Sequence, residues 1–142
     1  MADNSIFRSR TGYIEHSPES IFNFITDLRN FTRFIPEGRA TINDLQRDAC
    51  SFNVSMLGTV NISVAEKHEY NKVLYTGNIL QLNNFTLTLE IERREDRRAE
   101  VNLSLVAEMN PVMKMVANEP VRQLLETLVK EMEAFDDWEN TI

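Results

Sequence analysis

The chain has 142 residues, which suits one domain that buries a substantial apolar core. Its formal net charge of -7 would be repelled by nucleic-acid phosphates and by anionic membrane surfaces, so neither is an expected partner. The single cysteine, Cys50, cannot form an internal disulfide and is expected to be a small buried hydrophobe. The sequence shows no signal-peptide core and no bilayer-spanning apolar run, which predicts a cytoplasmic protein without a stable membrane anchor.

The first predicted strand spans about Ser5 to Ile14, and a well-marked helix start follows it. Ser17 suits the N-cap because its hydroxyl can accept a hydrogen bond from a free first-turn amide. Pro18 and Glu19 suit the first helical positions, where a missing N–H and a negative charge are both tolerated. Apolar residues at three- and four-residue spacing then share one helix face: Ile21, Phe24, Ile25 and Leu28.

A second short helix is predicted directly after the first. Asn30 is its expected cap, Phe31 and Phe34 are its apolar residues, and Pro36 ends it. We interpret the phenylalanines of both helices first of all as a core-facing stripe.

From about Ala40 onward the apolar pattern changes to a period of two, which predicts half-buried antiparallel strands. The clearest case is 85–92, where Phe85, Leu87, Leu89 and Ile91 alternate with Thr86, Thr88, Glu90 and Glu92. Three further segments follow the same rule, through Phe52, Val54 and Met56, through Val60, Ile62 and Val64, and through Val101, Leu103 and Leu105. The connections at Leu57-Gly58, at Glu69 to Lys72 and at Arg93 to Arg98 are short enough to form hairpins.

The last predicted element is one long helix from Asn110, its cap, to about Phe135. Its apolar residues are Met113, Val116, Ala117, Val121, Leu124, Leu125, Leu128, Met132 and Phe135. Pro120 lies inside it, and an internal proline costs about 3 kcal/mol. The apolar phase nevertheless continues across Pro120, which favours a single kinked helix over two separate ones.

The order of elements, the segment SPESIFNFITDLRNFTRFIP and the closing NPVMKMVANEPVRQLLETLVKEM resemble the START-like helix-grip superfamily, also called SRPBCC or polyketide cyclase/dehydrase-like. The likeness is nearest to small bacterial members of unassigned function and to the branch similar to an accessory subunit of carbon monoxide dehydrogenase. It implies an α+β fold in which a curved antiparallel sheet of about six or seven strands wraps around the long C-terminal helix. Two short helices follow the first strand. We expect one such domain over residues 1–142, with about 136–142 as a flexible acidic tail.

The resemblance implies a cavity between the sheet and the C-terminal helix that binds a small hydrophobic ligand, such as a lipid, a sterol-like molecule or an aromatic compound. The residues expected to line it are Phe24, Leu28, Phe52, Val54, Ile62, Phe85, Leu87, Leu103, Met113, Val116 and Leu124. Flexible methionines such as Met113 can reshape around an irregular guest. In this interpretation the protein is a non-catalytic carrier or sensor.

The residues provide no catalytic signature, and no cofactor or metal is predicted. His16 and His68 fall in polar surroundings and are expected at the surface. Asp27 is a candidate for the cavity mouth, with a solvated helix residue as the alternative.

Two other functions stay open at the level of sequence. With a filled core, the protein would be an interaction or assembly-helper module that uses the outer sheet face or the tail with Trp138 to bind a protein partner. A cyclase or dehydrase would require an acidic or histidine side chain inside the cavity, and analogy alone supports it.

Overall fold

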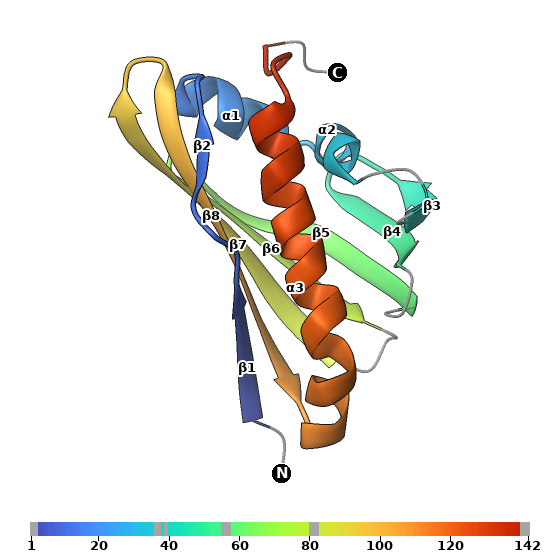
Figure 1. Cartoon of the computed structure of the whole chain (residues 1–142). Coiled ribbons are helices and arrows are strands. Elements are labelled where there is room, and N and C mark those ends of the chain that lie inside the picture. Colours follow the sequence, from blue (N-terminus) through green and yellow to red (C-terminus); the bar gives the residue numbers. More distant parts are fainter. Residues whose placement is uncertain (1–2, 36–37, 39, 55–57, 80–82, 140–142) are drawn as a thin grey trace.

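The structure is a computed structural model that describes residues 3–35, 38, 40–54, 58–79 and 83–139. One curved sheet wraps around a long C-terminal helix, with short helices at one end, so the predicted α+β class is confirmed (Figure 1). The elements are β1 (Asp3–Arg8), β2 (Gly12–Ile14), α1 (Pro18–Ile25), α2 (Leu28–Phe31), η1 (Thr32–Phe34), β3 (Ala40–Leu45), β4 (Ala49–Val54), β5 (Gly58–His68), β6 (Lys72–Ile79), β7 (Asn83–Glu95), β8 (Arg98–Met109) and α3 (Pro111–Ala134).

The strands form a single antiparallel sheet in the order β1-β8-β7-β6-β5-β4-β3, and β2 also pairs with β8. Residues of β4 to β8 alternate between the face that packs on α3 and the opposite face, which we call the outer face. The predicted period of two is therefore confirmed in β4, the first half of β5, β7 and β8, and β6 shows the same alternation without having been predicted. Met56, Leu57 and Pro36 lie outside the described residues.

The prediction of one strand from Ser5 to Ile14 is wrong, because β1 and β2 are separate. Arg8 pairs with Ser104 and Gly12 pairs with Val101, so the N-terminal chain uses one more residue than β8 over this interval. This extra residue bends the chain between the two strands (Figure 1). Within the described residues the sheet consequently has eight strands, where about six or seven were predicted.

The first helix begins as predicted, and the second does not. The Ser17 hydroxyl accepts from the Ser20 amide at 3.2 Å, which confirms the N-cap of α1. The cap of α2 is Asp27, whose carboxylate accepts from the Arg29 amide at 3.0 Å. Asn30, the predicted cap, is buried inside that helix. A carboxylate is an equally good N-cap and also complements the helix dipole, so the helix starts one turn earlier than expected.

The C-terminal helix α3 runs without interruption from Pro111 to Ala134 with Pro120 inside it, as predicted. The Asn110 side chain caps it by accepting from the Met113 amide at 2.8 Å. Buried residues begin at Ala117, and the first two turns expose Val112, Met115 and Val116. The prediction that Val116 faces the core is therefore wrong, because the side of α3 that faces the core passes through Met113, Ala117 and Val121, and Val116 lies beside it.

The segment after α3 is anchored by an aromatic cluster. Trp138 is completely buried, and its ring lies 5.3 Å from Phe24, 5.2 Å from Phe34 and 5.2 Å from Phe135, measured between ring centroids. The indole N–H donates to the Phe135 carbonyl at 3.0 Å. The described part of the predicted flexible tail thus contributes a core residue, and Trp138 is not exposed for a partner.

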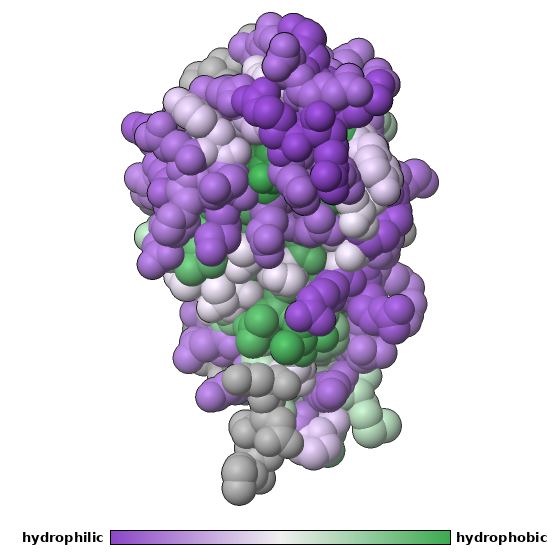
Figure 2. All heavy atoms as spheres, turned by 90° about the vertical axis from the view of Figure 1, so that its left-hand side faces the viewer, coloured by the Kyte–Doolittle hydropathy of each residue, from purple (hydrophilic) through white to green (hydrophobic). Residues whose placement is uncertain are grey.

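The surface on the left of Figure 1 is mostly hydrophilic, and its largest hydrophobic area lies in the lower half (Figure 2). This is the expected appearance of an antiparallel sheet that buries one face and exposes the other.

Replacing Trp138 with Ala should destabilise the protein by about 3–5 kcal/mol, because the surrounding phenylalanines would lose their central packing partner. Urea denaturation checks this prediction. Glu139→Gln, which alters an exposed side chain of the same segment, is the control and should change stability by less than about 0.5 kcal/mol. Equal stabilities of the two variants would mean that the segment is not part of the folded core.

Candidate ligand-binding cavity

A small apolar cavity of about 40 Å³ lies between α3 and the sheet. Phe31 and Ile35 close it from the short helices, and Val121, Leu124, Leu125 and Leu128 of α3 cover it. The sheet contributes Phe52, Val60, Ile62, Ile79, Phe85, Leu87 and Leu105. Every described lining residue is apolar, so the cavity can hold hydrocarbon but offers no side-chain polar group to orient a guest.

Five of the eleven residues predicted to line a cavity do so: Phe52, Ile62, Phe85, Leu87 and Leu124. Phe24 instead packs in the aromatic cluster, and Leu28 and Leu103 are buried outside the cavity. Val54 and Met113 are half-buried at the margin of the core, and Val116 is 53% exposed. Whether the five lining residues contact a ligand stays a prediction.

Two of the α3 residues predicted to line the cavity, Met113 and Val116, lie too close to the start of the helix. The α3 residues that cover it are Val121, Leu124, Leu125 and Leu128, which continue the predicted apolar phase about two to four turns beyond Met113. The phase indicates which side of a helix is buried. It does not indicate which turn lies over which strand, because that depends on the register between α3 and the sheet.

Tyr75 attaches the short helices to the sheet beside the cavity. Its hydroxyl donates to the Ile25 carbonyl at 2.7 Å, and its ring lies 5.3 Å from Phe31. Complete burial raises the pKa of this phenol, so it stays a neutral hydrogen-bond donor. Tyr75 therefore holds α1 and Phe31, which lines the cavity, against β6.

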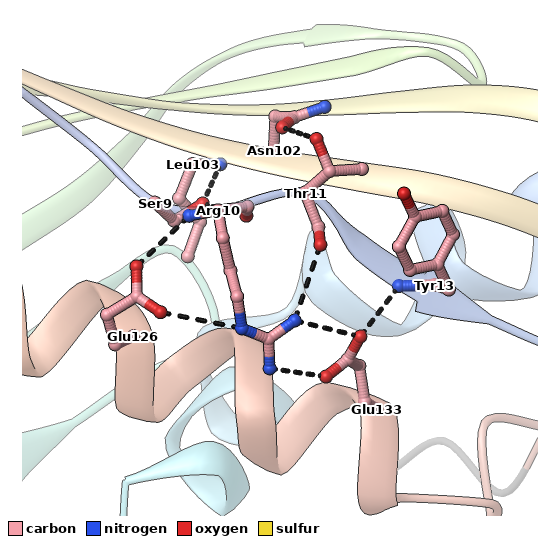
Figure 3. Close-up of polar contacts among 8 residues, drawn as sticks. All are labelled: Ser9, Arg10, Thr11, Tyr13, Asn102, Leu103, Glu126 and Glu133. Carbon is pink, nitrogen blue, oxygen red and sulfur yellow. Dashed lines mark hydrogen bonds and ion pairs between the residues drawn. The ribbon is translucent and has the colours of Figure 1, made fainter.

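A charged clasp attaches α3 to the bend between β1 and β2 (Figure 3). The Arg10 guanidinium makes a bidentate pair with Glu133 at 2.6 and 3.1 Å, and its backbone N–H donates to Glu126 at 3.1 Å. The Tyr13 amide donates to Glu133 at 2.9 Å. The hydrogen bond from Arg10 lowers the pKa of the Glu133 carboxyl, while Glu133 raises the pKa of Arg10. The bend between β1 and β2 therefore attaches the N-terminal strands to α3 through Arg10.

The other titratable candidates lie away from the cavity. Burial raises the pKa of the Cys50 thiol to about 11, which leaves it un-ionised and confirms a buried hydrophobe. His68 is exposed and pairs with Glu66 at 3.2 Å, as predicted for a surface residue. Asp27 pairs with Arg29 at 2.6 Å, and this hydrogen bond lowers the pKa of its carboxyl. Asp27 caps α2 and pairs with Arg29, and these two contacts account for its position without a role at the mouth of the cavity.

His16 differs from the predicted surface histidine because it is half-buried. The centroid of its ring lies 6.4 Å from that of Trp138, and its buried Nδ1 atom has no hydrogen-bond partner in the described part of the chain. Within the described ranges, no group of three or more His, Cys, Asp and Glu side chains is arranged to hold a metal ion. The described helices also include none long and apolar enough to cross a membrane.

No protein-family model and no curated protein matches this sequence, whereas solved structures match its fold. Truncated norcoclaurine synthase from Thalictrum flavum is similar over 93% of this chain and 92% of its own, with a TM-score of 0.71 and 8% identity. A START superfamily protein from Mycobacterium smegmatis is similar over 91% and 94%, with a TM-score of 0.62 and 17% identity. An HSP90 activator from Plasmodium falciparum is similar over 70% and 71%, with a TM-score of 0.50 and 20% identity.

The chain therefore has the START-like helix-grip fold, as its sequence predicted. The same fold is used by an enzyme, norcoclaurine synthase, so the fold alone does not specify a function.

Leu128→Ala should destabilise the protein by about 2–5 kcal/mol and enlarge the cavity, because Leu128 is almost fully buried against its wall. Val116→Ala on the same helix is the control, and its effect should stay below about 0.5 kcal/mol because Val116 is half exposed. Urea denaturation measures both. Similar losses for the two variants would contradict the assignment of the covering turns.

The clasp predicts a particular dependence of stability on pH. Because the pKa of Glu133 is lowered from its ordinary 4.5 in the folded state, its contribution is complete above that value and is lost as the pH falls through the lower, folded pKa. Glu133→Gln should therefore be less stable than the wild type near neutral pH, by at most about 1 kcal/mol because Arg10 is half exposed. This difference should shrink in urea melts at about pH 3.5. Glu119→Gln, on the exposed side of α3, is the control and should show no such dependence on pH. A difference in stability between Glu133→Gln and the wild type that stays constant with pH would disprove the clasp.

Proposed function

We propose that the protein binds a small hydrophobic ligand, such as a lipid, a sterol-like molecule or an aromatic compound, between α3 and the sheet and acts as a non-catalytic carrier or sensor. The observation that carries this proposal is the cavity lined throughout by apolar residues beneath the covering turns of α3. The START-like fold supports the proposal, since it is known to enclose apolar guests. The absence of a titratable side chain among the described lining residues favours binding over acid-base chemistry.

Binding requires that the cavity enlarge. Its volume of about 40 Å³ in this structure is far below the roughly 300–1,000 Å³ of typical ligand pockets. Leu124 is only half-buried at the margin of the cavity, so a modest outward shift of α3 would admit a guest between this residue and the sheet. Each buried methylene contributes about 0.8 kcal/mol, and a guest that buries roughly eight of them would offset the cost of association and reach micromolar affinity.

Native mass spectrometry of protein purified from a bacterial host tests this proposal first, because a bound guest adds a discrete mass to the chain. Thermal denaturation with fatty acids, sterols and aromatic compounds is the second test. A ligand at a hundredfold excess over its dissociation constant should stabilise the native state by about 2.7 kcal/mol, which raises the melting temperature by several degrees.

The matched variants are Leu124→Trp and Val116→Trp. The indole at position 124 should occupy the space into which the cavity expands and abolish the thermal shift, while the same change at the exposed position 116 should preserve it. A chain that carries no guest and gives no shift with any compound of the panel would refute the ligand proposal.

The small cavity volume also favours a second candidate, an assembly-helper module with a filled core. The HSP90 activator shows that a chain with a similar fold can act on another protein. This module would show no guest mass and no thermal shift, and Leu124→Trp would leave its function intact provided that the variant folds.

A further inference from the structure

A second hollow lies on the outer face of the sheet, on the side opposite to α3. It has a volume of about 540 Å³, within the range of ligand pockets, and spans the four neighbouring strands β5, β6, β7 and β8. We call it the outer groove. Its polar side chains include Asn61, Asn78, Asn84, Ser63, Thr76 and Thr86.

The strand register arranges these side chains in two rows across the sheet. Asn61 pairs with Asn78, and Asn78 pairs with Asn84, so three amides follow one another on adjacent strands. Ser63, Thr76 and Thr86 form the parallel row of hydroxyls. Neighbouring strands lie about 4.8 Å apart, which spaces the groups of each row evenly along the groove.

One pair within the amide row is held in place. The Asn61 side-chain N–H donates to the Asn78 side-chain oxygen at 3.0 Å. Among the described residues, the Asn61 side-chain oxygen and the Asn78 side-chain N–H groups have no hydrogen-bond partner, so they offer an acceptor and donors. The groove thus offers both kinds of hydrogen-bonding group side by side, in an orientation that needs no ordering when a ligand binds.

Gly77 allows the close approach of the two strands that carry this pair. A Cβ atom at Gly77 would collide with the Asn61 carbonyl and lie 2.9 Å from the Phe85 ring. The missing side chain therefore lets β5 and β6 come together beneath Asn61 and Asn78.

The charges and the backbone restrict the class of ligand. Glu108 is the one charged residue among the described residues that line the groove, and the chain carries a net charge of -7, so an anion is disfavoured. The backbone groups of β5 to β8 are used in ladders on both sides, so a peptide cannot add to the groove as another strand. The hydrogen bonds must come from side-chain amides and hydroxyls.

We infer that the outer groove binds a neutral, hydroxyl-rich ligand of the saccharide class. Each sugar hydroxyl both donates and accepts hydrogen bonds, and the adjacent rows of amides and hydroxyls offer partners for both roles. The half-buried Val106 adds an apolar surface against which the C–H face of a sugar ring packs. This site is separate from the cavity beneath α3, because it lies on the opposite face of the sheet.

Titration of the ¹⁵N-labelled protein with cellohexaose, maltohexaose and chitohexaose, followed by NMR, tests the inference. At least one of these neutral hexasaccharides, at up to about 10 mM, should cause saturable shifts of the Asn61 and Asn78 side-chain amides. Asn78→Ala should weaken this binding about tenfold, because it removes a donor group and releases Asn61.

Two variants serve as matched controls. Thr88→Val, on the same strand as Thr86 but outside the groove, should bind the saccharide like the wild type. Leu124→Trp, on the other face of the sheet, should also bind it normally, which distinguishes this inference from the proposed function. Asn84→Ala, at an exposed position, replaces Asn78→Ala if the latter does not fold. The absence of saturable shifts with all three saccharides, or equal affinity of Asn78→Ala and Thr88→Val, would overturn the inference.

Discussion

The packing of α3 on one face of the antiparallel sheet is the interaction on which the rest of the structure depends. Strands β4 to β8 present a continuous apolar face, which is stable only when another element removes it from water. The later turns of α3 provide this cover through Val121, Leu125, Leu128 and Met132, which are all buried. Pro120 is compatible with this role because the helix continues through it and keeps its apolar side toward the sheet.

The remaining elements fix where α3 lies. Arg10, in the bend between β1 and β2, makes a bidentate pair with Glu133 and so attaches the helix to one edge of the sheet. At the same C-terminal end of α3, Trp138 packs among Phe24 of α1, Phe34 of η1 and Phe135, and Tyr75 connects α1 to the sheet through its hydrogen bond to Ile25. The phenylalanine-rich helices therefore close one end of the core, and this packing role explains their composition without reference to a ligand.

The two faces of the sheet differ chemically, and the two proposed sites differ accordingly. The inner face is lined by branched and aromatic hydrocarbon and leaves about 40 Å³ unfilled, so a guest there gains from burial and must displace packing contacts. The outer face carries amides and hydroxyls around a hollow of about 540 Å³, where a guest gains from hydrogen bonds without disturbing the core. Gly77 and Phe85 both line the outer groove. Phe85 also lines the inner cavity, so it lies at the boundary between the two sites.

The sequence alone determined the α+β class, the cap of α1 at Ser17, the alternation of buried residues in β4, β5, β7 and β8 and the continuity of α3, because these follow from local propensity and periodicity. Five of the residues expected to line a cavity also lie around the small cavity beneath α3. The tertiary structure decided the division of the first strand near Arg10, the exposure of Val116 and the burial of Trp138. These features depend on which distant groups meet: the bend exists where Glu126 and Glu133 receive Arg10, and Trp138 is buried because the turn after α3 brings it against Phe24. Periodicity specifies which side of an element is buried, but only the register between elements specifies its neighbour.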